Sequence, residues 1–389
     1  MSADAAAPVP PEPSPFPEAP APKGNLSQRF KAFKERNHIA FEVSFFFAGF
    51  LFDVVLLHRI DSTPLLIHQG LYLVLSAALI FWDHRLHVAG KEPEGFVGKL
   101  ASYRLWVMHF FLGTLLNAFM VFYFRASSGV LSFIFLIALA AIIVANELPR
   151  FRSRGPIVRV MLLSFAMTSY LAYLIPVLWG QLHSWQYVVA VAFGCAGTFG
   201  LWKFFTRFTH DPNWTLQRAV YPGLVMQAVL LSAYFLRVIP PVPLSLKHIG
   251  VYATVGSTKD EKGHKHYELA YQPAPFYEFW AKESDTFVGP VGSKPFVFVR
   301  IFAPTKFHDQ VRFAWEYDDP DKGWTARGNP FSTGISGTGE EGYRTYANST
   351  MSKPGKYRVR VLTTDDREIG RKTFTFEEGE APATETEID

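Results

Sequence analysis

Seven long apolar runs fill most of the first 240 residues, and they constrain the fold more than any other feature. Each has roughly the 20 residues that a helix needs to cross about 30 Å of hydrocarbon. Charged residues make up 19% of the chain, against about 25% in a soluble protein. Because backbone groups in lipid must be satisfied within each segment, these runs predict a polytopic α-helical bundle of seven transmembrane helices over residues 23–238. The runs lie at 39–57, 64–82, 103–124, 129–146, 157–179, 185–203 and 219–237.

Lysine and arginine are divided unequally between the links that join the runs. Sixteen lie in the N-terminal segment and the even-numbered links, against three on the other side, which are Arg59, Arg125 and Arg237. Because positive residues are retained in the cytoplasm, the N-terminus is predicted to be cytoplasmic. An odd number of spans then places the polypeptide after residue 238 outside the cytoplasm.

The N-terminal residues 1–22 contain eight prolines, with alanine and glutamate between them. Such a composition cannot bury a core, so this segment is predicted to be a disordered Pro/Ala-rich tail. It lacks the basic start and apolar centre of a signal peptide.

A different pattern begins after the proline-rich linker predicted at 239–248. Short runs of alternating apolar and polar residues are separated by turn signals such as "DDPDKG" (318–323) and "SKPG" (352–355). This period of two predicts an all-β, immunoglobulin-like sandwich over 249–377. The acidic segment 378–389 is predicted to be a disordered tail. The predicted strands are 250–255, 266–272, 295–302, 311–317, 342–348, 357–363 and 369–376.

The C-terminal part resembles a known family in several ordered stretches. These are "PPVPLSLKHIGVY", "APFYEFW", "VRIFAPTKFHDQVRFAWEY" and "GYRTYANSTMSKPGKYRVRVLTTDDREIGRKTFTF". They resemble the bacterial envelope domain known as domain of unknown function 2914, and the apolar part resembles the multi-pass membrane region that often precedes it. The resemblance implies a bacterial inner-membrane protein, in which the C-terminal domain, placed outside the cytoplasm by the charge distribution, would be periplasmic. It supplies no activity and no catalytic residue.

Two carboxylates, Glu42 and Asp53, interrupt the first apolar run. Eleven residues apart on a helix, they share one face but lie roughly 16 Å apart along the axis, too far to act as a pair. Asp53 lies near the outer end of its run, as His68 does in the next, which suggests an Asp53–His68 pair. Ionisable groups inside membranes often mark functional sites. The alternative interpretation is that these residues only fix the packing of the first helices.

Three further polar residues fall within apolar runs: His109, Asn117 and Gln227. With the two acids and His68 they would line a polar intramembrane site, as in a transporter or membrane-embedded enzyme. They would equally serve as separate hydrogen bonds between helices, each stabilising the bundle by about 1 kcal/mol.

Three tryptophans of the predicted sandwich, Trp280, Trp315 and Trp324, are candidates for a surface that binds glycan or protein. The alternative is that they belong to the core. The lone Cys195 excludes an intrachain disulfide and a CxxC site, and no motif indicates a catalytic residue, a metal or a cofactor. The acidic balance after residue 244 argues against a nucleic-acid partner. The expected function is therefore that of a membrane-anchored binding or sensing protein rather than an evident enzyme. Its expected partners are the lipid bilayer and a periplasmic protein or glycan.

Overall fold

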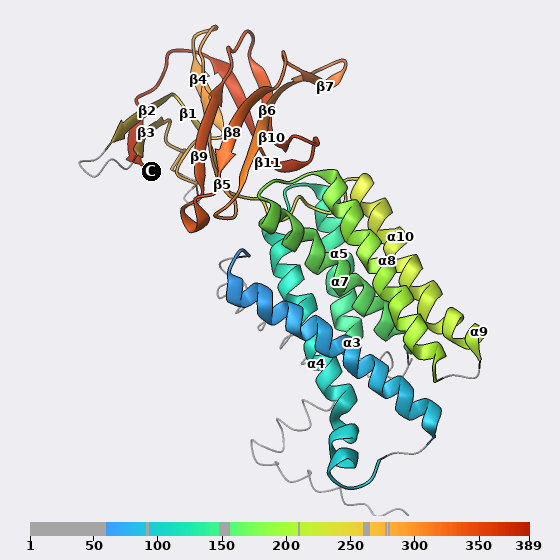
Figure 1. The fold of residues 1–389 in the computed structure, drawn as a ribbon. Coiled ribbons are helices and arrows are strands. Elements are labelled where there is room, and N and C mark those ends of the chain that lie inside the picture. The colour runs from blue at the N-terminus through green and yellow to red at the C-terminus, as the bar shows by residue number, and fades with distance from the viewer. Residues whose placement is uncertain are drawn as a thin grey trace, which may run out of the picture. The chain divides into compact units, whose positions relative to one another are not determined.

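The computed structural model describes residues 60–389 except 91–92, 148–155, 209–210, 260–264, 277 and 279–280. The predicted tail 1–22 and the first predicted span, 39–57, lie outside the described residues. Along the chain, the described helices come before the strands, and the two kinds of element occupy separate parts of the sequence (Figure 1). The helices are α3 (Thr63–Ala89), α4 (Gly95–Ala126), α5 (Val130–Glu147), α7 (Pro156–Trp179), α8 (Ser184–Thr206), the short α9 (Pro212–Thr215), the π-helix η1 (Leu216–Val220) and α10 (Tyr221–Phe235).

Six of these helices coincide with the second to seventh predicted spans. Four of them, α3, α4, α7 and α8, are long and apolar enough to cross a membrane. Helix α5 is apolar over the shorter stretch Val130–Val144, and α10 has 15 residues. The described residues thus support a helical region with four clear membrane-span candidates, and they do not establish the predicted number of seven.

The outward faces of the helices carry large apolar side chains. Examples are Ile67 and Val74 on α3, Trp106 on α4 and Ile137 on α5, each between 65% and 69% exposed. A soluble protein rarely leaves so large an apolar surface in water. These side chains are suited to contact lipid.

The ends of two of the helices are set by glycine. Gly90 follows α3 with φ 63°, and its N–H donates to the Leu86 carbonyl oxygen at 3.2 Å. Gly180 follows α7 with φ 82°, and its N–H donates to the Pro176 oxygen at 2.8 Å. Left-handed backbone of this kind closes a helix at little steric cost only when the residue is glycine.

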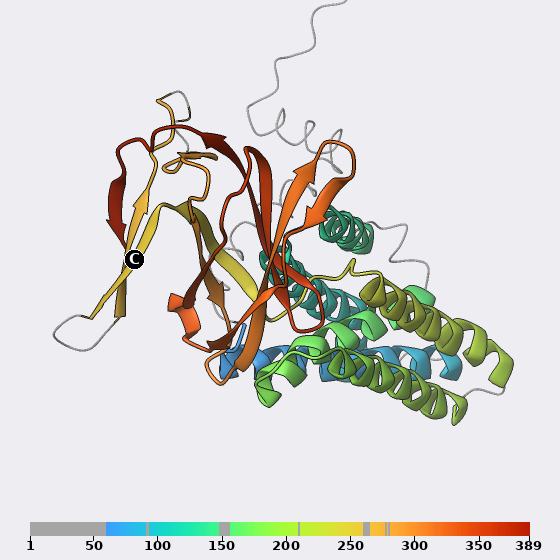
Figure 2. The same cartoon turned by 90° about the horizontal axis from the view of Figure 1, so that it is seen from above.

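Within the described residues, twelve strands form three sheets, seen from two directions in Figures 1 and 2. One sheet has the order β1-β5-β9, the second β4-β11-β10-β6-β7 with β8 also paired to β6, and the third β12-β3-β2. All pairs are antiparallel except β4 with β11. The strands are β1 (Ser245–Tyr252), β2 (Thr254–Lys259), β3 (Lys265–Tyr271), β4 (Thr286–Gly289), β5 (Phe296–Phe302), β6 (His308–Asp319), β7 (Gly323–Ala326), β8 (Phe331–Ser336), β9 (Tyr343–Asn348), β10 (Gly355–Thr363), β11 (Glu368–Glu378) and β12 (Glu385–Ile388).

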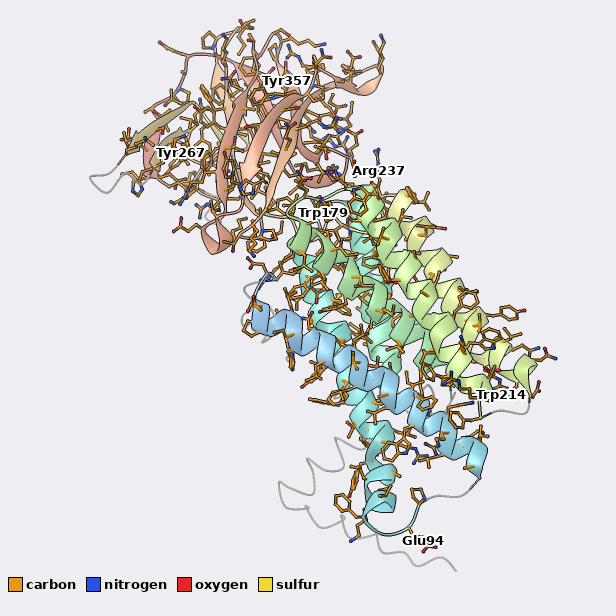
Figure 3. The ribbon with its side chains drawn as sticks, viewed as in Figure 1. Glu94, Trp179, Trp214, Arg237, Tyr267 and Tyr357 are labelled. Carbon is orange, nitrogen blue, oxygen red and sulfur yellow. The ribbon has the colours of Figure 1, made fainter. Side chains whose placement is uncertain are left out.

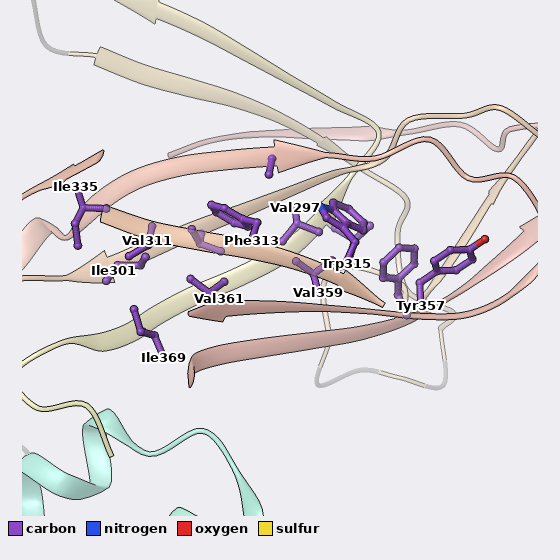
Figure 4. Close-up of a cluster of buried hydrophobic side chains, with 14 of the residues drawn as sticks. Val297, Ile301, Val311, Phe313, Trp315, Ile335, Tyr357, Val359, Val361 and Ile369 are labelled. Carbon is purple, nitrogen blue, oxygen red and sulfur yellow. The ribbon is translucent and has the colours of Figure 1, made fainter. Parts of the chain in front are cut away.

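The main core lies between the first two sheets (Figure 4). Alternate residues of β6 and β10, such as Phe313 and Val359, point into it from one side, and Val299 of β5 points into it from the other. The opposite face of β5 places Phe298 in a second core against β3. Strand β5 is therefore covered on both faces, which explains its almost continuous apolar sequence "FVFVRIF". The prediction of an all-β C-terminal part is confirmed.

The structure differs from the sequence prediction at both ends of the β domain. Strand β1 begins at Ser245, inside the predicted linker 239–248, because its backbone pairs with β5. The segment 378–389 was predicted to be disordered, but Glu385–Ile388 forms β12 on the edge of β3. The acidic side chains of that segment form ion pairs with basic residues and accept hydrogen bonds from tyrosine hydroxyls. These contacts offset the repulsion between the acids, which was the reason for predicting disorder.

Candidate functional site

The predicted intramembrane residues do not gather into one site within the described part of the chain. Glu42 and Asp53 lie outside the described residues. His68 is exposed on α3, with its ring centroid 4.0 Å from that of Tyr72. His109 and Asn117 are partly buried on α4. The predicted Asp53–His68 pair therefore stays a prediction.

Gln227 is fully occupied in a contact between α10 and α7. Its side-chain amide nitrogen donates to Ser164 Oγ at 2.7 Å and to the Ser164 carbonyl oxygen at 3.1 Å. Its side-chain oxygen accepts a hydrogen bond from Thr168 Oγ1 at 2.7 Å. A Cβ at Gly194 of α8 would collide with this group, so glycine is needed for the close approach of the three helices. Gln227 serves helix packing, as the alternative interpretation holds.

Of the three tryptophans predicted to form a binding surface, the two that the structure describes differ in exposure. Trp315 is 5% exposed and packs its ring edge-on against Phe374 in the main core. The alternation of β6 directs it inward. Trp324 is partly exposed, but the Arg358 guanidinium covers its ring at 4.2 Å from the centroid. Trp280 lies outside the described residues.

A polar cavity of about 570 Å³ opens beside β1, β3, β11 and β12, and we call it the charged cavity. This volume is in the range of small-molecule sites. The charged side chains that line it are four carboxylates and three cations, namely Glu283, Asp285, Glu387, Asp389, Lys282, Lys372 and Arg300. The wall also includes the rings of His248, Tyr252 and Tyr271 and the apolar side chains of Leu269 and Ile388.

One wall holds a chain of hydrogen bonds that begins at β1. His248 Nε2 lies 2.8 Å from the Tyr252 hydroxyl oxygen, and this hydroxyl donates to Glu387 Oε1 at 3.3 Å. Because the hydroxyl proton points to the carboxylate, the His248 Nε2–H must donate to the phenol oxygen. Glu387 also pairs with Lys282 at 2.7 Å. These contacts fix the orientation of each polar group at the cavity surface.

The opposite wall is organised around Glu283. Its Oε2 accepts the Val251 N–H at 3.1 Å, and its Oε1 lies 3.5 Å from Lys372 Nζ. The same ammonium group is 2.8 Å from the Asp285 carboxylate. Glu283 and Lys372 have side chains only 15% and 19% exposed, so their charges interact with little screening by water.

The third group ties β12 to β5 and β9. The Asp389 carboxylate forms ion pairs with Arg300 and Arg344, the latter at 2.9 Å. On the other side, the Tyr271 hydroxyl donates to Glu385 at 2.8 Å. The acidic C-terminal strand is therefore held by complementary charge, and it forms one side of the cavity.

Burial shifts the pKa values of two groups in the cavity in ways that matter for ligand binding. Desolvation raises the pKa of the Glu283 carboxyl, although Lys372 and the Val251 N–H oppose the shift. Desolvation lowers the pKa of His248, and the positive charge of Arg300 lowers it further. Both effects favour the neutral form of His248. Clustered shifts of this kind are typical of functional sites.

The arrangement is suited to holding a polar ligand by hydrogen bonds. In the parts of the chain that the structure describes, no group of three His, Cys, Asp or Glu side chains could hold a metal ion. The cavity offers fixed donors and acceptors on opposite walls. Sequence reasoning missed it because its residues come from six separate segments. One sequence signal was available, the alternation of acids in "ETEI" (385–388).

The β10–β11 hairpin contacts the C-terminal end of α10 and the segment after it through Arg367. This side chain is 5% exposed. Its guanidinium donates to the Ile239 carbonyl oxygen at 2.8 Å and to the Tyr234 carbonyl oxygen at 2.5 Å. It also lies 3.4 Å from the centroid of the Tyr234 ring. Burial lowers the pKa of this guanidinium, while the side chains of Tyr234 and Tyr187 oppose the shift.

Two acids of the β domain bind backbone N–H groups at the start of α8. Asp365 accepts from the Ser184 N–H at 2.5 Å and from its hydroxyl at 2.8 Å. Asp309 accepts from the Leu182 N–H at 2.9 Å. A carboxylate at a helix N-terminus satisfies free donors and interacts favourably with the helix dipole. We call Arg367, Asp365 and Asp309 the outer latch.

The outer latch and the charged cavity are close together in the sequence at the start of β11. Arg367 immediately precedes β11, and Lys372 lies five residues further on.

Comparison with known proteins places residues 308–376 in a family described as protein of unknown function, DUF2914. Among curated proteins, none matches the sequence. An immunoglobulin-like protein from Pseudomonas aeruginosa is similar at 9% identity and TM-score 0.20, over 35% of this chain and 98% of that one. An alkylpurine DNA glycosylase from Pseudomonas fluorescens, solved with DNA containing an abasic-site analog, is similar at 12% identity and TM-score 0.21. That match covers 82% of this chain and 99% of the glycosylase.

Proposed function

We propose that this protein is a bacterial inner-membrane sensor that presents a periplasmic, immunoglobulin-like β domain to the cell envelope. Its charged cavity binds the saccharide part of an envelope glycan, and the outer latch relays the bound state to a bundle of seven spans. The observation that carries the proposal is the composition of the charged cavity, in which paired charges, tyrosine rings and apolar side chains share one small volume.

Membrane insertion is supported by two independent features. The helices are long and apolar, and large apolar side chains remain on their outward faces. The excess of Lys and Arg on one side of the spans gives the orientation. The cytoplasmic N-terminus and the periplasmic β domain follow from that excess.

The saccharide is favoured by the charge balance of the cavity. Four carboxylates face three cations, and ion pairs join most of them. A strongly charged ligand would have to break these pairs, whereas hydroxyl and amide groups can donate to the carboxylates and accept from the cations without breaking them. Leu269, Ile388 and the tyrosine rings supply apolar surface for the C–H faces of a sugar ring.

Orientation is tested by thiol labelling in intact cells. In a Cys195→Ser background, cysteine is introduced at Lys322, in the exposed turn between β6 and β7, or at Glu94, exposed between α3 and α4. A membrane-impermeant maleimide should label the Lys322→Cys variant and not the Glu94→Cys variant. The reverse pattern would contradict the orientation.

Binding is tested by calorimetry on the purified full-length protein in detergent, with soluble oligosaccharides released from bacterial cell wall. Glu387→Gln breaks the ion pair with Lys282 and replaces the charged acceptor for Tyr252 with a neutral amide oxygen, and it should weaken binding about tenfold. Glu341→Gln is the matched control, because that side chain is 76% exposed and does not line the cavity. Equal affinity of the native protein, Glu387→Gln and Glu341→Gln for the oligosaccharides would refute the saccharide proposal. Binding of a protein partner without binding of oligosaccharide would refute it too.

A further inference from the structure

A second cavity, of about 260 Å³, lies where the first turn of α5 and the end of α10 meet the β10–β11 hairpin. We call it the arginine cavity. Its wall combines the stretch 128–132 at the start of α5 with four arginine side chains and two acids. The charged residues are Arg237, Arg360, Arg367, Arg371, Asp366 and Glu368.

The positive charge of this cavity is only partly compensated. Arg371 binds both oxygens of Glu368, at 2.5 and 3.0 Å, and Arg360 binds the same carboxylate at 2.8 Å. Arg237 and Arg367 have no carboxylate at ion-pair distance within the part of the chain that the structure describes. An anion entering the cavity would therefore meet two guanidinium groups that no acid already neutralises.

Exposed apolar side chains adjoin these cations. Val130 and Leu131 line the cavity and are 75% and 50% exposed. Phe235 and Leu236, exposed as well, directly precede Arg237. Arg237 and Trp179 mark one end of the helices, and Glu94 and Trp214 mark the other (Figure 3).

The height of this cavity relative to a bilayer is indicated by aromatic residues. Trp179 and Trp185 are both exposed and pack edge-to-face with centroids 5.4 Å apart. Tryptophans gather at the boundary between hydrocarbon and head groups. The arginine cavity, at the same end of the helices as Trp179, therefore lies at the level of lipid head groups.

The backbone conformation of Arg237 indicates that the fold does not need an arginine side chain at this position. Its φ is 58°, directly after the helix cap, where glycine is the usual residue. A side chain in this left-handed conformation is sterically strained. Glycine would fit this backbone better, so the turn itself does not require arginine.

We propose that the arginine cavity binds the phosphate group of an anionic phospholipid in the leaflet that faces the β domain. The Arg237 guanidinium contacts the phosphate, and the acyl chains lie against Val130 and Leu131. Arginine suits this task because its planar fork of donors matches phosphate oxygens. The inference relies on the membrane insertion proposed above, and it is independent of the saccharide.

The test titrates the full-length protein in detergent micelles with dihexanoyl phosphatidylglycerol and counts bound lipid by native mass spectrometry. Dihexanoyl phosphatidylcholine and inorganic phosphate are the comparison ligands. Arg237→Gly removes the cation at a backbone position that favours glycine, so misfolding is not expected. Arg237→Lys keeps the charge without the fork, and Lys306→Gln removes an exposed cation that does not line the cavity.

We expect the anionic lipid to bind about tenfold more tightly than the zwitterionic one. Arg237→Gly should abolish this preference, Arg237→Lys should keep part of it, and Lys306→Gln should leave it unchanged. Equal binding of the two lipids, or an unchanged preference in Arg237→Gly, would overturn the proposal. Displacement of the lipid by millimolar inorganic phosphate would show a site for free anions and would overturn it too. A protein that stays soluble without detergent would instead refute membrane insertion itself.

Discussion

Replacing Arg367 by methionine should loosen the connection between the β domain and the helices while leaving each part folded. Methionine keeps the length of the side chain and removes its charge. The change deletes two hydrogen bonds to backbone carbonyl oxygens and the contact with the Tyr234 ring. The Ile239 carbonyl loses the Arg367 donor, whereas the Tyr234 carbonyl still accepts the Arg237 N–H at 3.0 Å.

The size of the effect follows from these contacts. Each charged hydrogen bond stabilises by about 1.5–3 kcal/mol, and the ring contact by about 0.5–2 kcal/mol. Relief of the cost of burying a guanidinium offsets part of this loss. We therefore expect the free energy of local opening at the outer latch to fall by about 2–3 kcal/mol, which corresponds to roughly 30- to 160-fold faster amide exchange.

Hydrogen exchange measured by mass spectrometry on the full-length protein reports this opening directly. The informative amides are those of Ile239, Val242 and Leu244, since the other residues of 239–244 are prolines without an N–H, and those of the first turn of α8. Lys356→Met is the control, because Lys356 is exposed on the same hairpin and lines neither cavity. If exchange in Arg367→Met rises by less than twofold over this control, the outer latch does not hold the two parts together.

Three other perturbations have defined outcomes. Gln227→Leu removes three hydrogen bonds between helices, which average about 0.6 kcal/mol each. It should therefore lower the stability of the detergent-solubilised protein in thermal unfolding by about 1–2 kcal/mol. Saccharide affinity should not change, and its loss would implicate the bundle in binding. Deleting residues 384–389 should abolish saccharide binding in calorimetry but keep the main core folded by circular dichroism, since β12 contributes no side chain to that core. The folded-state pKa of Glu283 is raised above its ordinary value of 4.5, so its contribution is lost as pH rises through the folded pKa. The stability of Glu283→Gln relative to the native protein should therefore rise between pH 4.5 and 7, and a constant difference would contradict the assigned burial effect.

The helical region was predictable from the sequence because length and apolar content alone determine where a membrane helix can form. The second to seventh runs match helices to within a few residues at most ends. The exceptions are α3 and α4, which extend into the basic link between them as far as Ala89 and from Gly95. A basic helix end remains stable in water, so hydropathy alone could not mark that boundary.

The β strands were predicted where side chains alternate and missed where pairing depends on distant segments. The alternation of "VRFAWEY" (311–317) correctly indicated a strand with one buried face, and it also implied that Trp315 points inward. The short strands β4 and β12 have no apolar alternation of their own. They form because β11 and β3 offer free backbone groups at their edges.

The charged cavity lay beyond sequence reasoning for the same reason. His248, Glu283, Lys372 and Glu387 are separated by up to 139 residues and meet only after three sheets assemble. The polar residues within the membrane spans attracted attention because a polar group is rare in apolar surroundings. Gln227 shows that the hydrogen-bonding groups of such a side chain can all be used in contacts between neighbouring helices.

The most direct test of the account is hydrogen exchange at residues 239–244 with and without a saturating cell-wall oligosaccharide. We expect the ligand to protect amides around the charged cavity and to change exchange at 239–244 in the native protein. Glu387→Gln should lose both effects, and Arg367→Met should keep the first and lose the second. Protection at the cavity with no change at 239–244 in the native protein would contradict the relay, and no protection at the cavity would contradict the binding site itself.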